Sequence, residues 1–162
     1  MPGDAWDQAT SSPLARLDAL GLTLPEVTPP LAAYVPAVIS GGYVYTSGQL
    51  PVADGKLQAT GKVGDAVSAE EAAGLARLCA LNGLAAAASV AGGLDAIRRI
   101  VKVTGFVASV PSFTGQPVVV NGASEFFIEV FGEAGRHARS AVGMAVLPLD
   151  TPVEVELIVE VA

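Results

Sequence analysis

The chain has 162 residues, enough for one domain, and about half of its residues are apolar, which is ample for a core. Sixteen acidic against nine basic residues give a net charge of −7, which disfavours a nucleic-acid partner because neutralising phosphates takes clustered Lys and Arg. A single cysteine excludes an internal disulfide, and one cysteine with one histidine cannot supply a structural zinc site.

We divide the chain into an N-terminal segment, residues 1–30, and a single domain, residues 31–162. The N-terminus lacks the basic region of a secretory signal, and no uninterrupted apolar run approaches the roughly 18–20 residues of a membrane span. We therefore expect a cytoplasmic protein without membrane partners. Ser12 and Pro13 predict the N-cap and first position of a short helix that ends before Gly21. Three prolines then predict an extended arm.

Two β-rich runs come next in the chain. The runs 34–39 and 43–50 flank a glycine turn at Gly41 and Gly42 and predict a hairpin. Turn signals continue to residue 66, with room for short strands between them. The first half of the domain is therefore expected to contribute an antiparallel pair to a sheet.

A long helix is predicted to follow. Ser68 and Glu71 form a capping box at its start, and Gly92 stops it. Cys79 lies in the apolar stripe of this helix without a neighbouring base. We interpret it as a buried small hydrophobic residue rather than as a nucleophile.

A strand at 97–110 and a second helix at 117–131 complete the central part of the chain. Gly105 interrupts the strand and predicts either a bulge or a close approach of another backbone or side chain. The order hairpin, helix, strand, helix, hairpin predicts an α+β domain in which two helices cover one face of a mixed, mostly antiparallel sheet. The other face is then solvated or meets another subunit.

The C-terminal stretch, residues 136–162, predicts two strands joined by a short turn. The second strand alternates, with one apolar face and one face that carries Glu154, Glu156, Ile158 and Glu160. If the strands pair directly, Ala145 lies opposite Glu154, and Arg139 shares a face with three carboxylates. Its guanidinium would have room for a planar carboxylate ligand among small neighbours. The alternative is an ordinary solvated face, with Arg139 and Glu160 as a cross-strand pair.

Common catalytic motifs are absent from the sequence. It contains no dinucleotide-binding glycine motif, P-loop, nucleophile elbow or zinc-protease motif, and we expect no cofactor and no metal. A Ser-His-Asp triad would have to use His137, for which the sequence predicts neither a serine nor an aspartate partner. The remaining polar groups favour binding a small carboxylate and guiding water over covalent catalysis.

Five short stretches, taken in order, carry a resemblance to a known family. They are YVPAV at 34–38, TSGQLP at 46–51, ARS at 138–140, LP at 147–148 and VEVE at 153–156. The set resembles the YjgF/RidA family of reactive intermediate deaminases, formerly called endoribonuclease L-PSP, and within it the longer subgroup with an N-terminal extension. The similarity covers about residues 32–162. It implies a chorismate-mutase-like fold and a homotrimer with a ligand site in each cleft between subunits.

The same resemblance implies an activity, the hydrolytic deamination of reactive 2-imino or enamine acids of the 2-aminoacrylate type. The products are 2-keto acids and ammonia, and no cofactor is used. Arg139 matches the arginine that clamps the substrate carboxylate, and Glu154 the glutamate that positions the attacking water. The remaining matched positions line the substrate site: Tyr34, Ser47, Gly48 and Asn121. Ala141 stands where core deaminases have a cysteine, which implies a larger and more apolar pocket.

The predicted register adds a geometric expectation. With Ala145 opposite Glu154, Arg139 lies six residues further along its strand, about 20 Å away at about 3.3 Å per residue. Arg139 and Glu154 then reach one small ligand only if they come from different subunits.

Three alternative functions stay open at this point. The first is a non-catalytic trimer that binds small carboxylates or keto acids, which the missing cysteine favours. The second is the ribonuclease activity in the older family name, which the net charge disfavours. The third is a purely structural interaction module.

Overall fold

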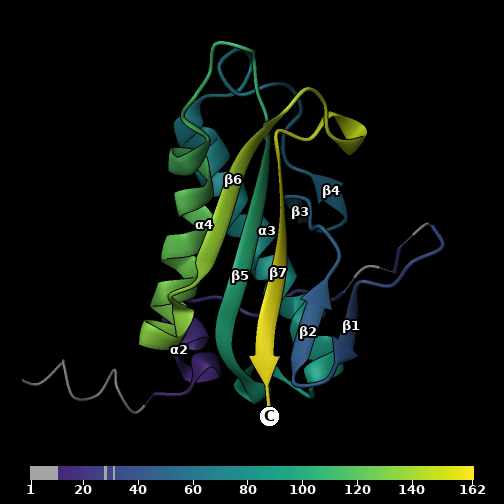
Figure 1. The fold of residues 1–162 in the computed structure, drawn as a ribbon, viewed down its shortest axis with the longest axis vertical. Helices are drawn as coiled ribbons and strands as arrows, with labels where there is room; N and C mark the ends of the chain where they lie inside the picture. The colour runs from purple at the N-terminus through teal and green to yellow at the C-terminus, as the bar shows by residue number, and fades with distance from the viewer. Residues whose placement is uncertain (1–10, 28, 31) are drawn as a thin grey trace, which may run out of the picture.

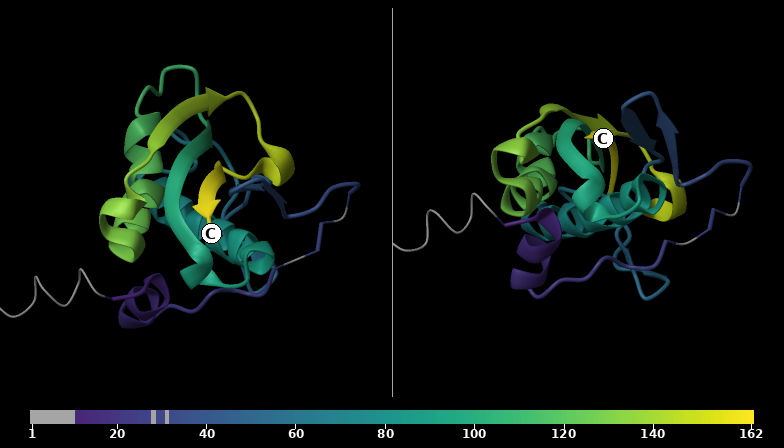
Figure 2. Two further views of the ribbon diagram at one scale, coloured as in Figure 1. Left: turned by 60° about the horizontal axis from the view of Figure 1, so that its bottom comes forward. Right: turned by 90° about the horizontal axis from the view of Figure 1, so that it is seen from below.

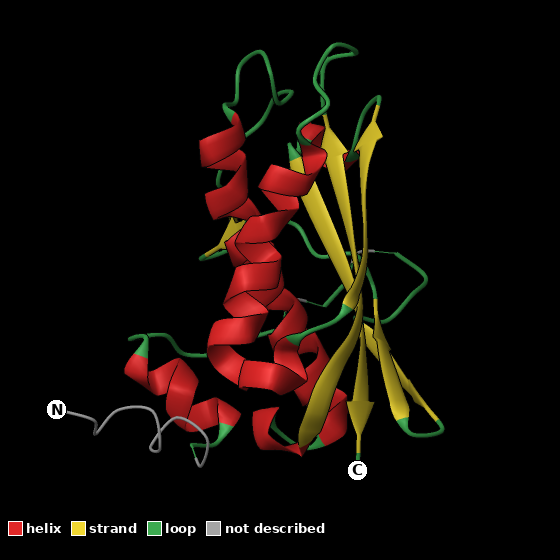
Figure 3. Cartoon of the chain, turned by 60° about the vertical axis from the view of Figure 1, so that its left-hand side comes forward, coloured by secondary structure: helices red, strands yellow, loops and turns green. Residues whose placement is uncertain are grey.

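The computed structural model describes residues 11–27, 29–30 and 32–162. A five-stranded sheet in the order β1-β2-β7-β5-β6 carries two long helices, α3 and α4, on one face and leaves the other face open (Figures 1 and 3). All neighbouring strands are antiparallel except β5 and β6, which run parallel. The predicted α+β domain, with two helices covering one face of a mixed sheet, is confirmed.

The strands of the main sheet are β1 (Ala37–Ser40), β2 (Tyr43–Thr46), β5 (Ile97–Ala108), β6 (Ala138–Met144) and β7 (Val153–Val161). A separate small hairpin is formed by β3 (Val52–Ala53) and β4 (Lys56–Leu57). The helices are α2 (Pro13–Ala19), α3 (Ala69–Ala91) and α4 (Gln116–Phe131), with 3-10 turns η1 (Leu94–Ala96), η2 (Gly132–Gly135) and η3 (Pro148–Asp150). The predicted hairpin around Gly41 is confirmed as β1 and β2, with shorter strands than expected.

The predicted C-terminal hairpin is wrong. β5 lies between β6 and β7 and pairs with both, so Arg139 aligns with Val103 and Glu154 aligns with Phe106. The connection after β6 contains two prolines and the turn η3, and it passes the end of β5 instead of closing a tight turn (Figure 1). Ala145 therefore does not lie opposite Glu154.

The two faces of β6 are also the reverse of those predicted. Paired residues on neighbouring strands share a face, so Arg139 lies on the side of buried Val103, towards α4. Val142, expected in the core, is exposed on the open face. In β7 the predicted alternation is confirmed, with the valines and Leu157 buried beneath the helices. Arg139 and Glu154 consequently lie on opposite faces of the sheet.

Helix α4 lies unusually close to β5 at one glycine. A Cβ built on Gly105 would overlap the side chain of Val120 on α4. The register shifts of β5 occur nearer its start, between Ile97 and Lys102, so of the two predictions for Gly105 the close approach is right and the bulge is wrong. This contact brings the polar residues that follow Val120 within reach of β6.

Helix α3 begins with the predicted capping box. Ser68 Oγ accepts from the Glu71 amide, and the Glu71 carboxylate accepts from the Ser68 amide, which lowers the pKa of Glu71. By length and composition α3 could cross a membrane, but half of the apolar window is buried, and it packs against α4 and β7 as a core helix. Cys79 within it is buried, and burial raises the pKa of its thiol well above the usual value, as expected of a hydrophobic role.

The N-terminal helix α2 forms as predicted. Ser12 caps it by accepting from the Ala15 amide, and Leu17 is fully buried in the core. Helix α2 packs against α4 and the turn η1, and Figure 2 shows it beside the end of α4. The start of the N-terminal segment, residues 1–10, lies outside the described residues.

Candidate functional site

Arg139, the predicted carboxylate clamp, is held by α4. Its Nη1 donates to Asn121 Oδ1 at 2.7 Å and to Ser124 Oγ at 3.3 Å. Asn121 and Ser124 are three residues apart on α4, so both lie on the helix face that meets β6. Ala141 follows two positions later on the same face of β6 as Arg139 and packs against the core. Three of the predicted site residues, Asn121, Arg139 and Ala141, are thus brought together.

His137 extends this group. Its Nε2 lies 2.8 Å from Ser124 Oγ, and its Nδ1 lies 2.6 Å from the carbonyl oxygen of Gly135. Burial and the neighbouring Arg139 charge lower the pKa of His137, against the opposing effect of the bond to Gly135. The sequence predicted no serine partner for His137, and the structure supplies one in Ser124. The partner of His137 Nδ1, where a catalytic triad has an aspartate, is the main-chain carbonyl of Gly135.

Glu154, the predicted water-positioning residue, lies on β7 beside Gly48. A Cβ built on Gly48 would overlap the Glu154 carboxylate, so only glycine leaves that space open. Gln49 pairs with Val155 through both backbone bonds, which fixes the segment after β2 along β7. Burial, reinforced by the charge of Glu156, raises the pKa of Glu154. Within the described part of the chain its carboxylate has no hydrogen bond and no ion pair.

Ser47 and Tyr34 lie towards the same end of the sheet as Gly48. Ser47 Oγ donates to the carbonyl of Val35 at 2.6 Å, and its amide donates to the carbonyl of Pro36 at 2.8 Å. These bonds tie the segment before β1 to the end of β2. Tyr34, just before that segment, has 57% of its surface exposed. Gly48 and Glu154 form a second group. Ser47 adjoins it as the neighbour of Gly48, and Tyr34 adjoins it as the neighbour of Val35, which Ser47 binds.

The two groups lie apart on one chain. We call the residues Asn121, Ser124, His137, Arg139 and Ala141 the arginine half-site, and the residues Tyr34, Ser47, Gly48 and Glu154 the glutamate half-site. Along the sheet their centres differ by three residues of β5 and by two strand spacings, about 10 Å in each direction. They also face opposite sides of the sheet. The distance predicted from the hairpin rested on a wrong register, but the sheet itself separates Arg139 from Glu154.

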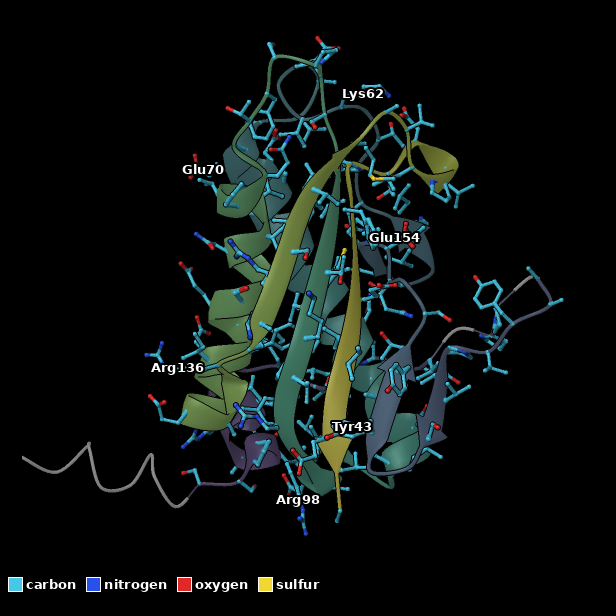
Figure 4. All side chains as sticks on the ribbon, in the orientation of Figure 1. Tyr43, Lys62, Glu70, Arg98, Arg136 and Glu154 are labelled. Atoms are coloured by element: carbon cyan, nitrogen blue, oxygen red, sulfur yellow. The ribbon has the colours of Figure 1, made fainter. Side chains whose placement is uncertain are left out.

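Two hollows of the single chain lie apart from Arg139 and Glu154, although His137 lines one of them. These open hollows, each of about 530 Å³, lie at the lower end of the open face, near the labelled Tyr43 and Arg98 in Figure 4. Their walls include Arg99, Arg136 and Glu160, and neither includes Arg139 or Glu154. Among the described residues no three His, Cys, Asp or Glu side chains are grouped to hold a metal ion.

Sequence reasoning missed the pairing of Ser124 with His137. The available signal was the spacing of three between Asn121 and Ser124, which places both on one helix face. It went unused because the predicted hairpin turned Arg139 away from the helices. With Arg139 on the helix side, the polar residues of α4 become its natural partners.

Comparison with known proteins gives a consistent set of relatives. The model of the YjgF/chorismate mutase-like endoribonuclease family matches residues 14–161. Protein TCP17 of Trypanosoma cruzi is 45% identical over 147 residues, which cover 90% of this chain and 92% of that protein. The crystal structure of Atu1372 from Agrobacterium tumefaciens, a protein of unknown function, is 51% identical, with a TM-score of 0.84 over 93% of this chain and 92% of that one.

A more distant relative was solved with a ligand. TdcF of E. coli with bound serine is 27% identical, with a TM-score of 0.62, and the match covers 85% of this chain and 94% of that one. Serine carries a carboxylate and a small side chain, the type of molecule that an arginine fork accepts.

Proposed function

The chain belongs to the YjgF/chorismate mutase-like family, and on that premise we propose that it hydrolyses reactive 2-imino acids to 2-keto acids and ammonia. The observation that carries the proposal is the arginine half-site. Arg139 is partly buried and held through one nitrogen, Nη1, by Asn121 and Ser124. The other guanidinium N–H groups have no partner among the described residues and are available to a carboxylate.

Glu154 supplies the second chemical function in this proposal. Its raised pKa makes the carboxylate a stronger base than an ordinary glutamate. It accepts a proton from water as the water oxygen bonds to C2 of the protonated imine. Glu154 then passes this proton to the nitrogen of the resulting carbinolamine. As the C2–N bond breaks and the carbonyl forms, Glu154 accepts the proton of the C2 hydroxyl and gives it to the departing ammonia. The products are the 2-keto acid and ammonium, and Glu154 is ionised again. Imines hydrolyse in water unaided, so orientation worth a few kcal/mol suffices.

Assembly is part of the proposal, because one chain holds its two half-sites on opposite faces of the sheet, with Arg139 on the edge strand β6 and Glu154 on the central strand β7. A head-to-tail contact places the β6 edge of one copy beside the β1-β2 edge of the next, and such contacts close into a ring. The family resemblance implies that the ring is a homotrimer. The open face supports burial against another copy, since it exposes large apolar side chains on three strands: Tyr43, Tyr45 and Val142 among them.

The test is a competition assay. An amino-acid oxidase or dehydratase generates the imine, semicarbazide traps it, and the protein competes by converting it to the keto acid. We expect competition from the wild type and its loss in Arg139→Ala. Arg98→Ala is the matched control, because Arg98 is an exposed arginine on β5 remote from both half-sites. Absence of competition by the well-folded wild type would contradict the proposal.

A second candidate function is a trimer that binds small carboxylates without turnover. Ala141 in place of the cysteine of core deaminases supports it, and so does the serine bound by TdcF. Titration with 2-ketobutyrate separates the two functions, because a pure binder takes up the keto acid and leaves the imine to the trap. The net charge of −7 disfavours RNA binding, and we expect a filter-binding assay at low salt to detect none.

A further inference from the structure

The hydrogen bonds around His137 have one consistent direction. The Gly135 carbonyl can only accept, so Nδ1 of His137 carries a proton and donates to it at 2.6 Å. With its pKa lowered, His137 is neutral at pH 7, and Nε2 is then an acceptor. The Ser124 hydroxyl therefore donates to Nε2 across 2.8 Å.

This direction decides what Ser124 offers to Arg139. With its hydrogen committed to His137, Ser124 Oγ presents only lone pairs to the Arg139 Nη1 at 3.3 Å. Asn121 Oδ1 accepts from the same nitrogen at 2.7 Å. Both hydrogens of Nη1 are thereby used within the chain. Nε and Nη2 form the other edge of the planar guanidinium, whose parallel N–H groups match the two oxygens of a carboxylate.

We propose that Ser124 and His137 are positioning residues, which hold Nη1 of Arg139 so that its Nε–Nη2 edge faces the ligand carboxylate. The inference rests on the proposed function in taking Arg139 as the carboxylate-binding group. It deepens that function by naming the ligand class as a carboxylate lying flat in the guanidinium plane, as in a conjugated 2-imino or 2-keto acid. The row of hydrogen bonds from the Gly135 carbonyl through His137 and Ser124 to Arg139 fixes this orientation of the guanidinium.

His137 also packs on the core, so its two roles must be separated. Its ring meets Phe127 edge-on, with 5.9 Å between the ring centroids. His137→Phe keeps an aromatic ring against Phe127 and removes the acceptor. His137→Gln loses the ring but places an amide oxygen within reach of the Ser124 hydroxyl. Ser124→Ala removes the bridging oxygen and adds a residue that favours a helix.

The first measurement is titration of 2-ketobutyrate into the wild type and these three variants, with imine kinetics in parallel. Loss of one hydrogen bond to a charged group predicts about tenfold weaker binding in Ser124→Ala and His137→Phe, and near wild-type binding in His137→Gln. KM should rise by about the same factor with kcat less affected, because the carboxylate is held equally before and during the reaction. Weaker binding in His137→Gln with wild-type binding in His137→Phe would assign His137 to packing alone.

The second measurement needs no ligand. In a nitrogen-15 NMR spectrum, the Nε–H signal of Arg139, identified by its loss in Arg139→Ala, should be sharp in the wild type and His137→Gln. It should broaden in Ser124→Ala and His137→Phe. If imines are turned over while this signal and keto-acid affinity are unchanged in every variant, the positioning inference fails alone. If the wild type neither turns over imines nor binds 2-ketobutyrate, the proposed function and the carboxylate-facing part of this inference both fail.

Discussion

The two half-sites of one chain differ in how completely they are built. At the arginine half-site, Arg139 is held by α4 through Asn121 and Ser124, and His137 orients Ser124. At the glutamate half-site, Glu154 lies half-buried against Gly48, and the described residues give its carboxylate no hydrogen bond. The binding group is preorganised within the chain, while the proposed base is left without a partner.

This difference has a physical meaning. A half-buried carboxylate without a hydrogen-bond partner is less stable than a solvated one, and its pKa rises accordingly. A chain that needed Glu154 only for folding would gain by pairing it or replacing it. Perturbed groups of this type gather at functional sites, because a base must keep its acceptor capacity for the proton it receives. The raised pKa of Glu154 and its position beside Gly48 thus fit the role of base in the proposed reaction.

The largest expected effect comes from mixing two inactive variants. Arg139→Ala and Glu154→Gln should each lose about 100-fold or more of the imine activity. If the half-sites meet between chains, co-refolding equal amounts should restore about a quarter of the wild-type activity, because each site draws its Arg139 and Glu154 donors independently.

A mixture that stays inactive, although mass spectrometry shows that chains have exchanged, would contradict the proposal that the two half-sites of different chains form one site. Mixing each variant with itself is the control, and it should restore nothing. Recovery in the mixture alone establishes that Arg139 and Glu154 of different chains complete one site.

A smaller effect is expected from Gly48→Ala, which tests the glutamate half-site alone. The added Cβ displaces the Glu154 carboxylate, and a shift of about 1 Å at a reacting group lowers kcat/KM by about 10–100-fold. Binding of 2-ketobutyrate at Arg139 should change much less. Gly42→Ala is the control, since a Cβ there makes only ordinary contact with Val161. Equal losses of activity in both variants would show that Glu154 is not the affected group.

Gly105→Ala tests the arginine half-site through the close packing of α4 on β5. The new Cβ would push against Val120 and move α4, which carries Asn121 and Ser124, away from β6. Overpacking of this type costs about 1–3 kcal/mol of unfolding free energy, measurable as a lower urea midpoint at constant slope. Gly74→Ala in α3, where a Cβ meets nothing within 4 Å, should instead stabilise by about 0.5–1 kcal/mol. If Gly105→Ala has the urea midpoint of the wild type, α4 moves to accommodate the new Cβ without loss of unfolding free energy.

Local signals in the sequence predicted most of the fold. The capping box at Ser68, the cap at Ser12 and the glycine turn at Gly41 each act over a few residues, and all three form as predicted. The buried face of α3 is mostly alanine, with Cys79 and Leu84 among the alanines. Small residues allow the close helix packing seen beside Gly122, where a Cβ would meet the Ala73 carbonyl.

The pairing of β6 could not be predicted in the same way. Alternation shows that two sets of residues face opposite sides, but it does not show which strand lies next to which. For β6 both sets are mixed, with Arg139 among small residues on one side and Val142 on the other. The position of β5 between β6 and β7 is a property of the whole sheet. The Ser124–His137 contact depends on this order and was missed with it.

The smallest expected effect is a shift of the acid limb of the pH profile of kcat/KM. Glu154 must be ionised to act as a base, so the limb reports its pKa in the free protein, above the usual value of a glutamate. Burial is the larger cause of the raised pKa and the charge of Glu156 the smaller. Glu156→Gln should therefore move the limb to lower pH without returning it to the usual value, because burial remains. Glu160→Gln, further along the same face, is the control and should leave the limb unmoved.

The pH dependence of the unfolding free energy gives an independent measurement of the Glu154 pKa. Because Glu154 has a raised pKa in the folded state, the folded chain binds more protons than the unfolded chain between the ordinary glutamate pKa and the folded one. Its contribution to stability is therefore largest at low pH and is lost as the pH rises through that window. Glu154→Gln should remove the decrease of unfolding free energy with pH, measured by urea unfolding at several pH values across the window. Glu156→Gln should narrow the pH window in which that decrease occurs. A decrease unchanged in Glu154→Gln would assign the titration to another carboxylate and leave the glutamate half-site without its base.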